Sequence, residues 1–254
     1  MKKEVVIKVK DLHKKYNGEL EAVKGISFEV YKNEVFGLLG PNGAGKTTTV
    51  EMMESLRSIS NGEISILGFD VRTNIKELKE RIGVQLQSSA FFEELTVCET
   101  LDLFASFYKY QKDLAEIIDD FDLQEKKNTL VKKLSGGQRQ RLSIGVAMVN
   151  DPEVIFLDEP TTGLDPQARR HTWEIIKKLK QRGKTVILTT HYMEEAEVLC
   201  DRVAIMDEGK IITLDTPQKL IENLLKSGFK KERVRQLADL EDVFLNLTGK
   251  SLRE

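Results

Sequence analysis

The chain has 254 residues, 40% of them hydrophobic and 31% charged, with a formal net charge of −2, which suits one large domain with or without an inserted subdomain. This charge gives no basic field for a nucleic-acid partner, and no apolar run approaches the roughly 18 residues that a transmembrane helix needs. The two cysteines, Cys98 and Cys200, lack metal-ligand spacing, so we expect a protein of the reducing cytoplasm.

The first part of the chain predicts mainly strands. Alternating or continuous apolar patterns place strands at residues 5–9, 26–30, 34–40, 63–67 and 82–86. A helix is expected at residues 46–56, directly after the third of these strands and a glycine-rich loop.

The middle of the chain has a helical pattern. Thr96 and Glu99 form a T-x-x-E capping box, which predicts the start of a helical stretch through Tyr110, with more helix to about Phe121. No strong strand candidate occurs between Phe92 and Pro152. These residues therefore predict a helical insertion.

Strands and helices alternate again in the last part. Strands are expected at residues 154–158, 185–190 and 202–206, and helices at residues 167–182 and 193–200. This alternation predicts βαβ units and a mainly parallel sheet. Thr216 and Pro217 have the chemistry of a helix start, so we expect a helical tail from there to Glu254.

The segment "GPNGAGKT" fits the phosphate-binding pattern G-x-x-x-x-G-K-[ST] between a predicted strand and a predicted helix. Backbone N–H groups of such a loop and the helix N-terminus bind phosphates. The lysine supplies a charge to the β- and γ-phosphates and the threonine hydroxyl ligates Mg²⁺. The candidate nucleotide-binding residues are Gly40, Pro41, Asn42, Gly43, Ala44, Gly45, Lys46, Thr47 and Thr48.

The segment "VIFLDEP" ends a predicted buried strand in two carboxylates. In an open α/β sheet, ligands bind beyond the carboxyl ends of the strands. We therefore expect Asp158 to hold Mg²⁺ and Glu159 to polarise a water for in-line attack on the γ-phosphate.

A second anion-binding candidate lies in "KKLSGGQRQRLSIG". Ser135 and Gln138 form another capping box. Gly136 and Gly137 cost about 0.5–1 kcal/mol each in a helix relative to alanine, so local stability does not explain them. Close approach of an anionic group does.

These three motifs together resemble the ATP-binding subunit of an ABC transporter, over essentially the whole chain. The resemblance implies an α/β fold: a RecA-like P-loop core with an N-terminal antiparallel β edge, an inserted helical subdomain and a short helical tail. It also implies one domain over residues 1–254. Its core would be 1–87 and 151–215, its helical signature subdomain 88–150 and its tail 216–254.

The resemblance also implies that two chains contribute to each ATP site. In a head-to-tail dimer, the signature of one subunit covers the γ-phosphate bound by the other, and Asp165 contacts the opposite subunit. The signature residues are Leu134, Ser135, Gly136, Gly137 and Gln138.

Three further roles follow from the same resemblance. Tyr16 matches an aromatic that stacks on adenine, although a tyrosine that covers the core fits the pattern too. Gln87 matches a glutamine that contacts Mg²⁺ and the attacking water, with Gln85 as a rival. His191, at the end of a core strand, matches a histidine that contacts the γ-phosphate, whereas His13 and His171 are expected at the surface.

The expected function is hydrolysis of ATP, with Mg²⁺ as cofactor, to power a separate transmembrane permease. The subunit would lie at the cytoplasmic face of the membrane and pair with a second ATP-binding subunit, a copy or a related chain. The segment 88–95 is a docking candidate because of Phe91 and Phe92, unless these rings pack in the insertion's own core.

The tail 237–254 resembles that of exporters of drugs, lipids and polysaccharides, with an amphipathic face of Leu237, Leu240, Val243, Phe244 and Leu247. An ATPase of a soluble machine, such as iron–sulfur cluster assembly, is the alternative function. A P-loop kinase is a weaker rival, since its chemistry does not require the Ser-Gly-Gly segment.

Overall fold

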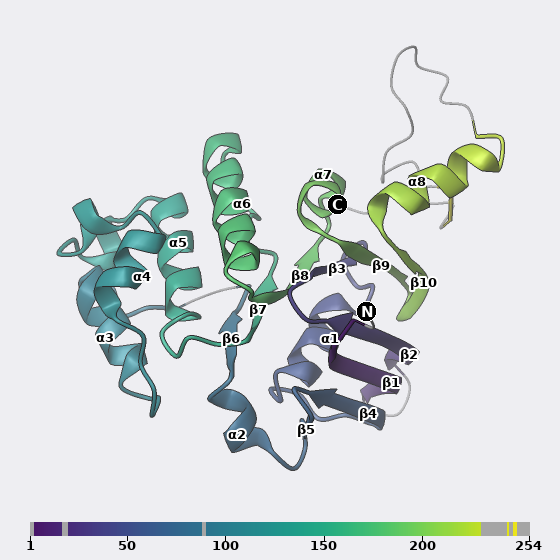
Figure 1. The fold of residues 1–254 in the computed structure, drawn as a ribbon, viewed down its shortest axis with the longest axis horizontal. Coiled ribbons are helices and arrows are strands. Elements are labelled where there is room, and N and C mark those ends of the chain that lie inside the picture. Colours follow the sequence, from purple (N-terminus) through teal and green to yellow (C-terminus); the bar gives the residue numbers. More distant parts are fainter. Residues whose placement is uncertain (1–2, 17–19, 88–89, 230–242, 244–245, 248–254) are drawn as a thin grey trace.

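The computed structural model describes residues 3–16, 20–87, 90–229, 243 and 246–247, and its described strands form two sheets (Figure 1). The four-stranded sheet, in the order β2-β1-β4-β5, contains β1 (Val5–Tyr16), β2 (Leu20–Tyr31), β4 (Asn61–Ile66) and β5 (Phe69–Asp70). The six-stranded sheet, in the order β10-β9-β3-β8-β7-β6, contains β3 (Val35–Leu39), β6 (Ile82–Gln85), β7 (Val154–Asp158), β8 (Thr185–Thr190), β9 (Arg202–Asp207) and β10 (Lys210–Asp215).

The helices of the described chain separate into groups in Figure 1. Their bounds are α1 (Lys46–Met53), α2 (Ile75–Lys79), α3 (Val97–Ala105), α4 (Leu114–Asp120), α5 (Gly136–Val146), α6 (Pro166–Gln181), α7 (Met193–Leu199) and α8 (Pro217–Lys226). Helices α3, α4 and α5 lie together on one side of the molecule, away from β1, β2 and β4.

The six-stranded sheet forms the centre of the molecule. Its strands are parallel except for β10, which runs antiparallel to β9. Every residue of β3, β7 and β8 is buried, as expected for parallel strands that are covered on both faces. The carboxyl ends of these neighbouring strands therefore meet at one edge, where β3 runs into α1.

The four-stranded sheet is the antiparallel edge that the sequence predicts. Its inward residues, such as Ile7 and Phe28, form one apolar cluster with Phe36 of β3 and Val50 of α1. A second cluster joins the other face of the central sheet to the helices of the insertion. The expected α/β architecture with an antiparallel edge and a helical insertion is thus confirmed.

The helical insertion differs from the prediction in one respect. Thr96 caps α3 through the expected box with Glu99, and no described residue between 92 and 152 lies in a strand. The sequence predicts a helical stretch through Tyr110 and more helix to about Phe121, and the first stretch is shorter than predicted. It breaks after Ala105, and α4 starts anew at a cap in which Asp113 accepts from the Ala115 N–H. A competing side-chain cap of this kind favours a new helix start over continuation.

Short edge elements were missed from the sequence. Strands β5 and β10 and helix α2 had no prediction, because each is short or only partly buried. The turn between β9 and β10 is formed by Glu208 and Gly209, whose φ values of +47° and +80° are those of a tight hairpin turn. The glycine at this turn is the feature of the sequence that could have indicated β10.

The predicted tail helix is confirmed in its first part. The Thr216 hydroxyl caps α8 by accepting from the Lys219 N–H, and Pro217 is its first residue. Of the expected amphipathic face further on, only Val243 and Leu247 are described, the first buried and the second exposed. Leu237, Leu240 and Phe244 lie outside the described residues.

Candidate functional site

The loop 40–45 joins the central strand β3 to α1 and is fixed by backbone contacts. A Cβ on Gly40 would lie 2.2 Å from the Met206 carbonyl oxygen, and one on Gly45 would lie 2.5 Å from the Ala22 carbonyl oxygen. Gly43 has a φ of +82° but open space around it. Two of the three glycines are therefore required by packing against β9 and β2, and the third only by its left-handed backbone.

Lys46 is a buried cation that curls back over this loop. Its side chain is 4% exposed, and its Nζ donates to the carbonyl oxygens of Gly40 at 2.8 Å and Pro41 at 3.1 Å. Burial lowers the pKa of the ammonium, and this effect outweighs the negative charges of Glu159 and Asp158, which raise the pKa. A buried cation beside the N-terminus of α1 is suited to receive phosphate oxygens.

Asp158 ends β7 next to the first turn of α1. Its Oδ1 accepts from Thr47 Oγ1 at 3.3 Å and from the hydroxyl of Thr189 on β8. Burial raises the pKa of this carboxyl, and this effect outweighs the hydrogen bonds from Thr189 and Thr47, which lower the pKa. Adjacent hydroxyl and carboxylate oxygens are the donors that Mg²⁺ prefers, so the residues present fit this metal.

Glu159 has the largest set of contacts with other candidate residues. Its Oε2 accepts from Gln87 Nε2 at 3.2 Å and from Thr162 Oγ1 at 3.1 Å, and it lies 3.5 Å from His191 Nδ1. Its Oε1 lies 3.9 Å from Lys46 Nζ. The structure therefore brings together four residues that the sequence predicted from the ends of different elements.

The backbone of Glu159 is strained. Its φ is +48°, a left-handed conformation that costs a non-glycine residue about 1–2 kcal/mol. The Glu159 N–H donates to Thr189 Oγ1 at 2.9 Å, so β8 holds the turn in place. Strain of this kind is concentrated at functional sites. Neither Thr162 nor Thr189 was predicted, since a lone threonine carries no motif.

The structure distinguishes between Gln87 and Gln85, the two candidates for the glutamine at the phosphate site. Gln85 is buried, and its Nε2 donates to the Leu86 carbonyl oxygen at 2.5 Å. Only Gln87 reaches the acidic end of β7.

Tyr16 lies in the wall of the same cavity, of about 510 Å³, as Lys46, Thr47, Gln87 and Glu159. Its ring is half-buried, and the cationic groups of Lys14 and Arg57 each lie 5.3 Å from the ring centroid. The cavity is also lined by residues that the sequence did not indicate, from β2 and the β9–β10 turn. These are Leu20, Glu21, Ala22, Lys24, Glu208 and Gly209.

The signature segment starts α5 with the expected capping box. The Ser135 hydroxyl accepts from the Gln138 N–H, and the Gln138 side chain accepts from the Ser135 N–H. A Cβ on Gly137 would lie 2.9 Å from the Ala168 Cβ, whereas one on Gly136 would meet nothing. Packing against α6 thus explains Gly137 but not Gly136, which corrects the expectation that neither glycine has a local reason.

The signature lines a second cavity, of about 430 Å³, that shares no residue with the first. Asp165 lies in its wall and caps α6, accepting from the N–H groups of Gln167 and Ala168 at 2.9 Å. His171, also in this wall, lies 2.6 Å from Asp122. Leu134 is partly buried and packs against the larger apolar cluster. Within one chain, the signature therefore does not complete the phosphate site.

Sequence comparison identifies relatives of this chain. The family described as "ABC transporter" matches residues 23–162, and a second description, "AAA domain, putative AbiEii toxin, Type IV TA system", matches residues 142–195. The chain is 42% identical over 222 residues to the Nod factor export ATP-binding protein I of Burkholderia orbicola, covering 85% of this chain and 73% of that protein. It is 39% identical over 246 residues to the linearmycin resistance ATP-binding protein LnrL of Bacillus subtilis, covering 91% and 79%.

Solved structures share the fold. An ATP-binding subunit of an ABC transporter superposes with a TM-score of 0.82 at 27% identity, covering 96% of this chain and 99% of that one. CbiO1 of Clostridium perfringens, part of the CbiONQ transporter complex, has a TM-score of 0.78 at 27% identity, with coverages of 87% and 94%.

A dimeric ATP-binding cassette in a post-hydrolysis state with ADP and Pi has a TM-score of 0.75 at 26% identity, with coverages of 83% and 98%. The match to the family, the export-related names of the relatives and the site geometry agree. The chain belongs to the ATP-binding, ATP-hydrolysing subunits of the ABC transporter family, with a RecA-like P-loop core.

Proposed function

We propose that this chain hydrolyses ATP at the Glu159 cluster to drive export through a separate membrane permease. The observation that carries the proposal is the convergence of Lys46, Gln87 and His191 on one carboxylate. The export direction is supported by the names of the two relatives described above.

The loop 40–45, Lys46 and Thr48 would hold the phosphates of ATP, and Tyr16 would stack on the adenine. Thr47, Gln87 and Asp158 would hold Mg²⁺, which compensates phosphate charge when bound. Glu159 would orient the attacking water. Its own orientation is fixed by Gln87 and Thr162. His191, whose Nδ1 lies 3.5 Å from Glu159 Oε2, would contact the γ-phosphate.

The signature would act on a second ATP-binding subunit. Three observations support this: its cavity is separate from the phosphate cavity, Gly136 faces open space, and a structural relative is a dimer with ADP and Pi. Asp165 lies beside the signature and so would belong to the same contact. Whether the second subunit is a copy or a related chain is decided by the dimer measurement given in the Discussion.

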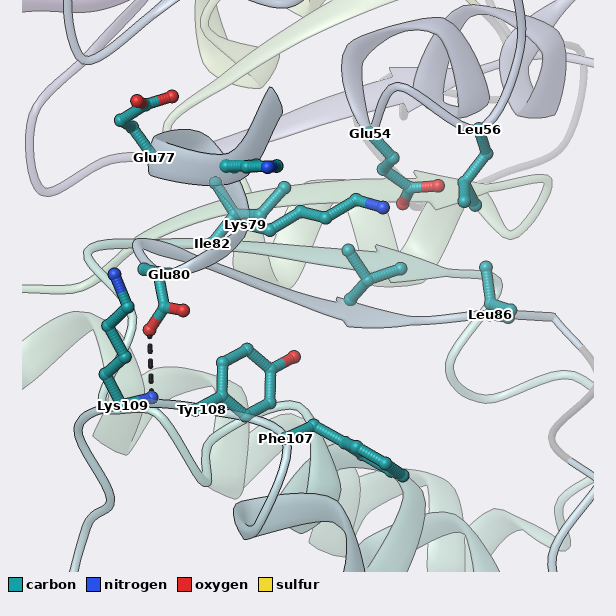
Figure 2. Close-up of a pocket in the computed structure, with 12 residues that line it drawn as sticks. Glu54, Leu56, Glu77, Lys79, Glu80, Ile82, Leu86, Phe107, Tyr108 and Lys109 are labelled. Carbon is teal, nitrogen blue, oxygen red and sulfur yellow. Dashed lines mark hydrogen bonds between the residues drawn. The ribbon is translucent and has the colours of Figure 1, made fainter. Parts of the chain in front are cut away.

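A groove of about 680 Å³ offers a docking site for the permease (Figure 2). It lies between α2 and β6 on one side and the segment after α3 on the other. Large apolar side chains line it while remaining exposed: Leu56 at 55%, Leu86 at 43% and Phe107 at 69%. Because Leu86 adjoins Gln87, an occupant of the groove would touch the chain next to the nucleotide site.

The docking surface expected from the sequence, residues 88–95, has one buried and one exposed aromatic ring. Phe91 is buried, and its ring packs edge-on against Phe104 at 6.0 Å between centroids. The alternative of core packing is therefore correct for Phe91, while Phe92 is 68% exposed.

We propose that the subunit lies at the cytoplasmic face of the membrane through this permease. Across the residues that the structure describes, none of the helices has the length and apolar character to cross a bilayer. No nucleic-acid partner is proposed.

A matched pair of variants tests the docking. Phe107→Asp places a charge in the groove, whereas Tyr110→Asp changes a similarly exposed aromatic, 63% exposed, that does not line it. Co-expressed with the permease, the first is expected to lose co-purification by about tenfold or more, as for an interface anchor, and the second to retain it. Equal recovery of both variants would refute docking in the groove.

A further inference from the structure

Glu54 is a buried acid in the wall of the groove described above. It directly follows α1 and is only 2% exposed. Its Oε1 is buried and has no hydrogen-bond partner. Figure 2 shows Glu54 and Leu56 entering the groove from the same wall.

The surroundings of Glu54 supply no cation that pairs with it. The charges with the largest influence on its carboxyl are both acidic, Asp158 and Glu51. The groove also contains Lys76, Lys79 and Lys109, yet none of them has an ion pair with Glu54 within 4 Å in the described chain. Figure 2 shows the Lys79 side chain extending across the groove, so this lysine is the local competitor for the carboxylate.

Chain stability does not explain an acid at this position. A buried acceptor without a partner is unfavourable, and an apolar side chain would complete the apolar groove wall. A buried carboxyl group that has no partner and faces an open groove can release its proton when a cation arrives from outside, and the resulting carboxylate pairs with that cation. The position is also connected to the nucleotide site, since α1 begins at Lys46 and Thr47 and ends next to Glu54.

We infer that Glu54 accepts a lysine or arginine side chain of the permease segment that occupies the groove. This inference rests on the proposed docking in the groove. The segment would present apolar side chains to Leu56, Leu86 and Phe107 and one cation to Glu54, which fixes its orientation. The cation would contact the end of α1 opposite the phosphate site, so that docking and nucleotide binding act on the same helix.

Charge variants of Glu54 in the complex with the permease test the inference. Glu54→Lys is expected to lower co-purification by about tenfold or more, and Glu54→Gln by less, because loss of one partner of a buried charge pair is costly. Glu63→Gln, an exposed acid outside the groove, is expected to leave recovery unchanged. Lys79→Met, which removes the local competitor, is expected to leave recovery equal or to raise it.

Two further measurements exclude trivial causes. The isolated Glu54→Gln subunit is expected to melt no lower than the unmodified chain, so that its loss of binding does not reflect unfolding. In the permease, a scan of cytoplasmic lysines and arginines to glutamate is expected to contain one position that restores binding of Glu54→Lys.

The outcomes separate this inference from the docking proposal. If Phe107→Asp loses the complex while both Glu54 variants keep it, the groove binds the permease but Glu54 does not receive a cation. If Lys79→Met loses the complex as Glu54→Gln does, the carboxylate serves this chain's own lysine, and the inference is wrong. If Phe107→Asp also keeps the complex, the docking proposal itself fails.

Discussion

Glu159 shows how far single residues could be predicted. Its place after a buried strand, beside a phosphate loop, was sufficient to expect it at the site of attack on the γ-phosphate. The resemblance to the family added Gln87 and His191. The supporting hydroxyls of Thr162 and Thr189 could not be predicted, because their role depends on the turn at Glu159 and on the pairing of β7 with β8.

Glu54 carries a prediction on pH. Burial, with repulsion from Asp158 and Glu51, raises the pKa of its carboxyl to about 8, whereas in the unfolded chain it is about 4.3. The folded state therefore keeps a proton that the unfolded state releases, and stability falls as the pH rises from about 4.5 to about 8. Each pKa unit corresponds to about 1.4 kcal/mol, so the total loss is a few kcal/mol.

Glu54→Gln removes this term. Between pH 5 and pH 9, the free energy of unfolding of the variant is expected to fall by a few kcal/mol less than that of the unmodified chain, as measured by urea denaturation. Glu77→Gln, at an exposed position, serves as the control and is expected to behave like the unmodified chain. Parallel pH profiles for all three proteins would show that Glu54 is not a buried, protonated acid.

At the scale of elements, buried strands were the most predictable. Strands β3, β7 and β8 are continuous apolar runs because both of their faces are covered. The capping boxes at Thr96 and Ser135 also identified their helix starts correctly. Strand β10 was missed because it lies at the sheet edge and is only partly buried, so its apolar signal is weak.

The two signature glycines predict opposite effects on α5. Gly136→Ala meets open space and gains helix propensity, so stability is expected to stay equal or to rise by about 0.5–1 kcal/mol. Gly137→Ala would press on Ala168 at 2.9 Å and is expected to destabilise by about 1–3 kcal/mol. Denaturant unfolding of both variants measures the difference, and equal stabilities would contradict the packing found between α5 and α6.

At the scale of the whole molecule, the phosphate site and the signature line different cavities of one chain. The sequence motifs could predict that both sites exist, but not the groove that we propose for docking. That groove is assembled from residues as distant in sequence as Glu54 and Lys109, which only the fold brings together. We propose that these two sites act on one nucleotide only when a second chain brings its signature to the phosphate site.

The most direct measurement is the mass of the Glu159→Gln protein by light scattering, with and without Mg-ATP. The Glu159→Gln substitution slows hydrolysis and should therefore trap the dimer in which ATP lies between two subunits. The protein is expected to be a monomer without Mg-ATP and a dimer with it. Adding Ser135→Arg, which fills the signature, should abolish the dimer while ATP binding persists. A Glu159→Gln protein that binds ATP and stays a monomer would contradict pairing of two copies of this chain.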